Sequence, residues 1–114
     1  MADKPVVWVD SSLEAVRGFP PDARRAAGYQ LRRVQRGLMP SDQKPLPPVG
    51  VGAQEIRIHT RTEHRVVYLA KFEEAVYVLH AFEKRSRRTR QADLALARER
   101  LAQVRALRRR SKER

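Results

Sequence analysis

Cationic side chains stand at the ends of three short apolar segments in the middle of the sequence. Arg57 alternates with isoleucines, Arg65 opens the next apolar segment, and Lys84 with Arg85 follows the last one. Arginine stays protonated and offers a planar fork of N–H donors, which suits a phosphate group. If the segments pair as strands, these cations can share one face or edge of a sheet. Each of them alone has a simpler interpretation as a solvated residue at the end of a strand.

Chemistry on a phosphate also needs groups that move protons. Arginine is a poor base because it does not lose its proton, so His80 and Lys84 are the better candidates. Histidine titrates near neutrality, but His80 alternates with Leu79 and Ala81, and a structural histidine in the core is the alternative interpretation.

The histidines lack the spacing of a metal site, and the sequence contains no glycine-rich phosphate loop and no nucleophile elbow. We therefore expect neither a metal nor a cofactor.

The charge balance indicates a polyanionic partner. Lys and Arg number 25 against 13 Asp and Glu, which gives a net charge of +12. Residues 82–114 hold 13 basic and 4 acidic residues, a net charge of +9, and the remaining residues carry +3. Such a field attracts phosphate backbones whatever their sequence. Nucleic acid is the leading partner, while an acidic protein and a merely solvated basic face are the alternatives.

The length of 114 residues fits one domain, which we expect over residues 1–107, followed by a frayed basic tail over 108–114. The sequence contains no cysteine, which excludes disulfides, thiolate metal sites and a cysteine nucleophile. No apolar run is long enough for a membrane span, and the first residues do not resemble a signal peptide. A cytoplasmic location is the expectation.

The first half of the sequence predicts one strand and two helices. Residues 6–9 are apolar and rich in valine, which is typical of a strand. Ser11 and Glu14 have the spacing of a capping box, so a short helix is expected to Arg17. A second helix is expected from Pro21 to about Gly37, and a loop over residues 40–52, which contain four prolines.

The second half predicts three strands and a helix. Residues 55–60, 65–70 and 75–82 have the composition of strands, and their short connections favour an antiparallel meander. The last of these strands is apolar on both faces and is expected in the middle of the sheet. A helix is expected to begin between Thr89 and Asp93, with apolar residues spaced three and four apart. The fold class is therefore α+β, with the helices on one face of the sheet.

The segment "EIRIHTRTEHRVVYLAKFEEAVYVLHAFEKRS" resembles the phage-related, HigB-like branch of the RelE/ParE toxin superfamily. The resemblance is carried by "PPVGVGAQEIRI", "RVVY", "VYVLHAFEKRS" and "DLALARERL", which lie in this order between residues 45 and 101. It implies a small RelE-like domain of a type II toxin–antitoxin system. Nucleases of the superfamily cleave messenger RNA in the ribosomal decoding site, without a cofactor. The expected partners are therefore messenger RNA on the ribosome and an antitoxin, which in this branch is usually a helix-turn-helix protein.

The resemblance also assigns roles to residues. Arg65 and Arg85 match the arginines that contact the scissile phosphate, and Arg57 and Lys84 match neighbouring basic positions. Glu83 departs from the pattern of the branch, and Gln91 stands where some relatives carry a catalytic tyrosine. Further RNA contacts are expected from cations in the turn after the first meander strand, after the last strand and on the final helix: Arg61, Arg87, Arg88, Arg98, Arg100 and Arg105. For the arginines of the final helix, the alternative is that they only solvate a helix whose other side packs on the sheet.

Two other functions stay open on the sequence. A protein that occupies the ribosome or a nucleic acid without cutting it would need the same basic surface. Members on the ParE side of the superfamily poison DNA gyrase, although the "LHAFEK" segment is closer to the HigB-like branch.

Overall fold

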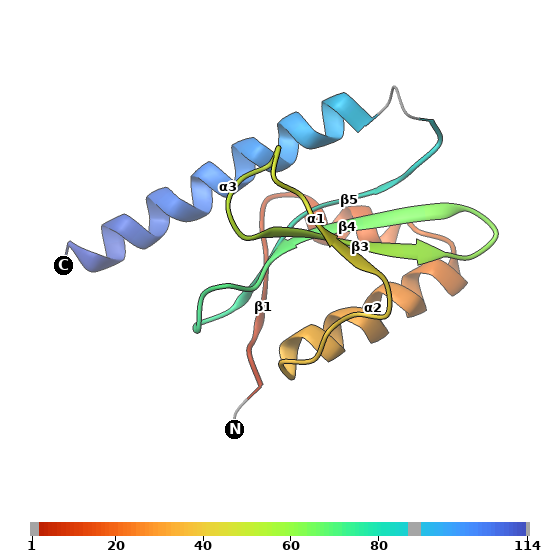
Figure 1. Ribbon diagram of the computed structural model, residues 1–114, viewed down its shortest axis with the longest axis horizontal. Helices are drawn as coiled ribbons and strands as arrows, with labels where there is room; N and C mark the ends of the chain where they lie inside the picture. Colours follow the sequence, from red (N-terminus) through yellow and green to blue (C-terminus); the bar gives the residue numbers. More distant parts are fainter. Residues whose placement is uncertain (1–2, 87–89, 114) are drawn as a thin grey trace.

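The computed structural model describes residues 3–86 and 90–113 and consists of a twisted sheet with helices on both sides (Figure 1). Within these residues the sheet has five strands in the order β1-β5-β4-β3-β2. Their bounds are β1 Val6–Trp8, β2 Gln43–Pro45, β3 Ala53–His59, β4 Glu63–Leu69 and β5 Val76–Glu83. The helices are α1 Ser12–Arg17, α2 Pro21–Gln35 and α3 Arg90–Lys112.

The predicted antiparallel meander is confirmed. β3 pairs with β4 and β4 with β5, both antiparallel, and Arg57 lies directly opposite Arg65. β5 lies inside the sheet, as its apolar composition predicted, because β1 pairs with its free edge. That pairing is parallel, so the sheet is mixed.

The stretch over residues 40–52 is not all loop. β2 pairs antiparallel with β3, with Lys44 opposite Glu55. Three residues are too few to show a periodicity, and Pro45 argues against a strand inside a sheet. At the edge of the sheet a proline is tolerated, because the missing N–H faces away from the neighbouring strand.

The helices do not lie on one face of the sheet, as the sequence led us to expect. α1 and α2 pack on a core that includes Ile56 and Val66, whereas α3 packs on the opposite face, over Val67 and Leu69. Successive residues of a strand point to opposite faces of the sheet, and the inner strands β4 and β5 carry apolar residues on both faces. On β3, Ala53 and Glu55 therefore share the α3 face with Arg57.

Two expectations about α1 and α3 are wrong. No side-chain hydrogen bond caps the start of α1; instead, Oγ of Ser11 accepts a 2.9 Å hydrogen bond from Arg100. Arg100 is 4% exposed and also donates to the backbone oxygen of Leu79 at 2.9 Å. It therefore joins α3 to β5 and the start of α1, and it does not face an RNA.

α3 crosses the sheet obliquely, and its C-terminal end projects beyond it (Figure 1). Its apolar stripe packs as far as Val104, but Leu107 is 58% exposed. The helix continues to Lys112, through most of the tail that we expected to fray. None of the helices in residues 3–86 and 90–113 is long and apolar enough to cross a membrane.

Candidate functional site

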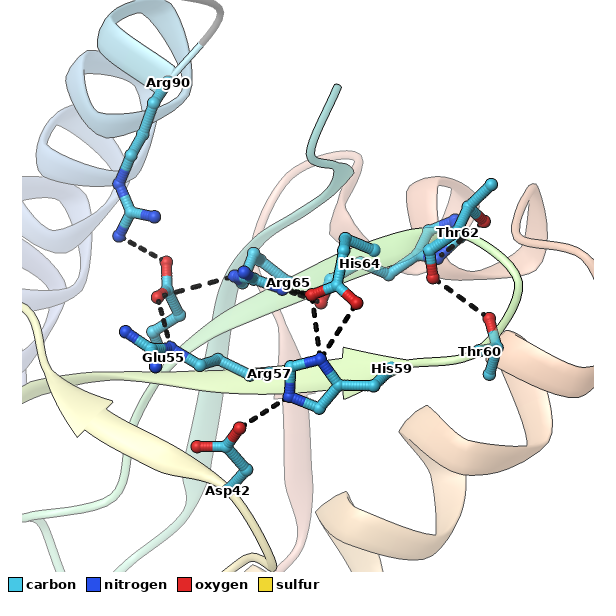
Figure 2. A network of polar contacts seen from close by, with 10 residues as sticks. Asp42, Glu55, Arg57, His59, Thr60, Thr62, His64, Arg65 and Arg90 are labelled. Carbon is cyan, nitrogen blue, oxygen red and sulfur yellow. Dashed lines mark hydrogen bonds and ion pairs between the residues drawn. The ribbon is translucent and has the colours of Figure 1, made fainter. Parts of the chain in front are cut away.

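A buried carboxylate lies at the centre of the candidate site. Glu55 of β3 is 0% exposed, and its Oε2 accepts a hydrogen bond of 2.6 Å from Arg90, the first residue of α3. The Nε atoms of Arg57 and Arg65 each lie 3.7 Å from its Oε1 (Figure 2). A single carboxylate is therefore the counter-charge of three guanidinium groups.

The sheet register explains this arrangement. Arg57 and Arg65 are directly opposed on β3 and β4, where like charges repel each other. Glu55 precedes Arg57 by two residues and so lies on the same face. Its charge offsets the repulsion between the two arginines, and the carboxylate is fully buried, with Arg90 of α3 bonded to it.

Lys84, at the end of β5, belongs to the same group of charges. Burial lowers its pKa, and the neighbouring charges of Arg65 and Arg90 lower it further, whereas Glu55 acts in the opposite direction. Its backbone N–H donates to the oxygen of Glu63 at 2.7 Å, which fixes the end of β5 against β4. We call Arg57, Arg65, Lys84 and Arg90 the cation cluster.

The four cations differ in their access to solvent. The side chain of Arg57 is 33% exposed, that of Arg90 17% and that of Arg65 6%. Lys84 is half-buried. The cluster thus offers partly desolvated donors, whose electrostatic interaction with an anion is stronger than that of fully hydrated charges.

Next to the cluster, an imidazole lies between two carboxylates. Nε2 of His59 is 2.6 Å from Asp42 (Figure 2), and its Nδ1 is 2.8 Å from Glu63. Hydrogen bonds to both carboxylates raise the pKa of His59, and the imidazole in turn lowers the pKa of Asp42 and that of Glu63. Oε1 of Glu63 also accepts from Arg65 at 3.1 Å, so this group is joined to the cation cluster.

The structure brings some of the predicted site residues together and leaves others apart. Arg57, Arg65 and Lys84 are close, whereas the side chain of Arg85 is 77% exposed and pairs with Glu83 at 3.2 Å. The other predicted RNA contacts are distributed as follows: Arg61 is exposed in the turn between β3 and β4, Arg98 on α3 donates to the oxygen of Pro48 at 2.8 Å, and Arg87 and Arg88 lie outside the described residues.

His80 lies between β5 and α3. Its Nε2 is 2.7 Å from Asp93, its ring stacks on Phe82 at 5.3 Å, and its side chain is 12% exposed. β5 contains a bulge: Val67 of β4 pairs with His80, the next residue Tyr68 pairs with Val78, and Leu79 is the extra residue between them. Because of this bulge, the neighbouring residues Leu79 and His80 both face α3. Both interpretations of His80, as a structural residue and as a proton carrier, are compatible with this position.

A comparison with protein families gives a match. The family model described as Phage derived protein Gp49-like (DUF891) matches residues 14–102, more than half of the chain. The chain belongs to the Gp49-like family. This is a family of RelE/HigB-type toxins, associated with toxin–antitoxin systems. The resemblance seen in the sequence is thus confirmed at the level of the toxin family. A comparison with curated proteins gives no match.

In this Gp49-like protein, several site residues could not be assigned from the sequence alone. Glu55, Arg57 and His59 alternate along one strand, and this pattern could have placed them on a shared face. The sequence gives no local signal for Arg90, which reaches the site only because α3 packs on the sheet. In the part of the chain that the structure describes, no three His, Asp or Glu side chains are arranged to hold a metal ion.

Proposed function

We propose that this Gp49-like protein is the toxin of a type II toxin–antitoxin system and acts as an endoribonuclease on messenger RNA in the ribosome. The observation that supports this most strongly is the cation cluster, with its buried counter-charge and an adjacent acid–imidazole group. A surface that only needed solubility would not bury Arg65 and Glu55 together, because desolvating charges costs several kcal/mol.

The proposed reaction uses the RNA as its own nucleophile. The 2′-oxygen attacks the adjacent phosphorus, and negative charge builds on the phosphate oxygens. Arg57, Arg65 and Arg90 would stabilise this charge, and Arg85 would contribute once the phosphate displaces its exposed ion pair with Glu83, since such pairs are weak. The ribosome would hold the messenger with the 2′-oxygen in line with the leaving oxygen, which lowers the barrier further.

The base that takes the 2′-proton must be unprotonated at working pH. Lys84 meets this need better than an ordinary lysine, because burial and neighbouring cations lower its pKa. His80 is the second candidate, with Asp93 holding its ring. A positioned base contributes roughly 10²- to 10⁴-fold to the rate.

RNA binding would extend beyond the site. Arg61 and Arg98 are exposed, and they are proposed to contact the RNA backbone together with Arg57, Arg87 and Arg88. The antitoxin would be an acidic or helix-turn-helix protein that neutralises this surface. We further propose that the toxin belongs to the HigB-like branch.

Induction of the protein in growing cells, with and without the adjacent reading frame, tests the proposal when combined with primer extension. The proposal requires growth arrest, relief by the neighbouring gene, and discrete cuts within translated codons. Stalled ribosomes on intact messages would show a binder that does not cut, and DNA breaks with intact messages would show a gyrase poison. Either of these results would contradict the proposed nuclease activity.

A further inference from the structure

The three histidines have different surroundings. His64 is 1% exposed and packs on the ring of Phe19 at 4.3 Å, and the side chain of His80 is 12% exposed under α3. The side chain of His59 is 52% exposed, although both of its nitrogens contact carboxylates. Of the three, His59 is therefore the most accessible to a large substrate.

His59 is also close to the cation cluster. It follows Arg57 by two residues on β3 and shares its face, which corresponds to roughly 7 Å along the strand. Glu63 is paired with His59 across β3 and β4 and contacts Arg65 as well. A phosphate held by Arg57 and Arg65 would thus lie within reach of the imidazole.

We propose that His59, oriented by Glu63, is the catalytic residue that protonates the 5′-oxygen leaving group when the cation cluster holds the scissile phosphate. This proposal rests on the proposed nuclease function. The 2′-oxygen forms a bond to phosphorus and gives its proton to the base. The bond between phosphorus and the 5′-oxygen breaks, its electron pair stays on the 5′-oxygen, and that oxygen takes the proton from Nε2 of His59. The products are a 2′,3′-cyclic phosphate and a 5′-hydroxyl.

The contacts indicate which carboxylate orients the ring and which one is displaced. Glu63 is fixed from two sides, by Nδ1 of His59 and by the guanidinium of Arg65. Asp42 precedes the edge strand β2, its side chain is 40% exposed, and His59 is its hydrogen-bond partner. The leaving oxygen therefore takes the place of Asp42 on Nε2.

The charges around His59 favour its protonated form. Asp42 and Glu63 face it from two different segments, and Arg57 and Arg65 lie behind these carboxylates. Hydrogen bonds to the two carboxylates raise its pKa, which favours the protonated imidazole that a general acid requires.

A messenger whose 5′-bridging oxygen is replaced by sulfur at the cleaved linkage tests the proposal. Sulfur leaves without a proton, so it removes the need for a general acid. On programmed ribosomes, His59→Gln should slow cleavage of the natural linkage by roughly 10²- to 10⁴-fold. The same variant should cleave the sulfur linkage within a few fold of the wild-type rate. Arg65→Ala, which removes charge stabilisation, should slow both linkages.

Equal slowing of both linkages by His59→Gln, or no slowing at all, would overturn the role of His59 while leaving the nuclease intact. A wild-type protein that cuts neither linkage would instead overturn the proposed function, and the role of His59 with it. Glu63→Gln provides a second test, whose expected result, a shifted pH–rate profile, cannot be produced by a loss of folding. It should shift the basic limb of the pH–rate profile to lower pH, whereas Glu73→Gln, in the exposed turn between β4 and β5, should leave the profile unchanged.

Discussion

Arg90 opens α3 and donates a hydrogen bond of 2.6 Å to Glu55, which precedes it by 35 positions and is fully buried in β3. The contact fixes the start of the helix on the sheet. It also supplies the third guanidinium around a single carboxylate. Folding and assembly of the site are therefore coupled through Glu55.

The first prediction concerns this carboxylate. Glu55→Gln leaves Arg57, Arg65 and Arg90 without their counter-charge, and breaking a buried ion pair costs about 3–5 kcal/mol. Urea denaturation should show a loss of this size. Inorganic phosphate should stabilise the variant more than the wild type, since it can replace the missing charge. Glu83→Gln, which breaks an exposed pair, serves as the control and should change stability by less than about 1 kcal/mol. A Glu55 variant as stable as this control would contradict the account.

A second prediction separates RNA binding from chemistry. Arg98 is exposed on α3, away from the cluster, so Arg98→Ala should weaken RNA binding about equally for all sequences. The slope of log affinity against log salt should fall by about one, because one phosphate contact is lost. The cleavage rate at saturating protein should stay the same. Filter binding over a salt series measures the slope, and an unchanged slope would remove Arg98 from the interface.

The third prediction tests the structural role of Arg100. Arg100→Met keeps the bulk of the side chain but leaves the oxygens of Leu79 and Ser11 without their donor. Buried polar groups without partners cost about 1–3 kcal/mol each, so the midpoint of urea unfolding should fall clearly. At a temperature where the variant is folded, the slope of its log RNA affinity against log salt should equal that of the wild type. A reduced slope would mean that Arg100 reaches the RNA after all.

The fourth prediction follows from the pKa shifts around His59. The pKa of His59 is raised above 6.5, so its contribution to stability is complete below this pH and is lost as the pH rises through the shifted value. The pKa values of Asp42 and Glu63 are lowered from 3.8 and 4.5, so their contributions are present above these values and are lost at lower pH. The stability difference between wild type and His59→Gln should therefore be largest between about pH 4.5 and about pH 6.5. Denaturation at several pH values checks this, and a difference that grows toward pH 9 would contradict it.

Part of the site could be predicted because its geometry is local. Arg57 and Arg65 are joined by a short turn, and alternation along two strands places them on one face. The position of β5 inside the sheet could also be predicted, because its residues are apolar on both faces. These inferences need only the two-residue repeat of a strand and a short connection.

The remaining features depend on contacts between distant segments. Which arginine of α3 is buried depends on how the helix lies on the sheet, and the spacing of charges did not distinguish Arg100 from Arg98. The sequence also could not predict how the helices divide between the two faces of the sheet. Strands that are apolar on both faces can pack against a helix on either face. Glu55 and Arg90 meet only once α3 is in place.

The most direct test of the central claim is primer extension on messages translated by purified ribosomes, with the wild type and Arg65→Ala compared at equal ribosome occupancy. The account predicts cuts within codons for the wild type, none on the same RNA without ribosomes, and a rate roughly 10²- to 10³-fold lower for the variant. Equal cleavage by the folded Arg65→Ala protein would contradict it, because the cation cluster would then play no part in the reaction.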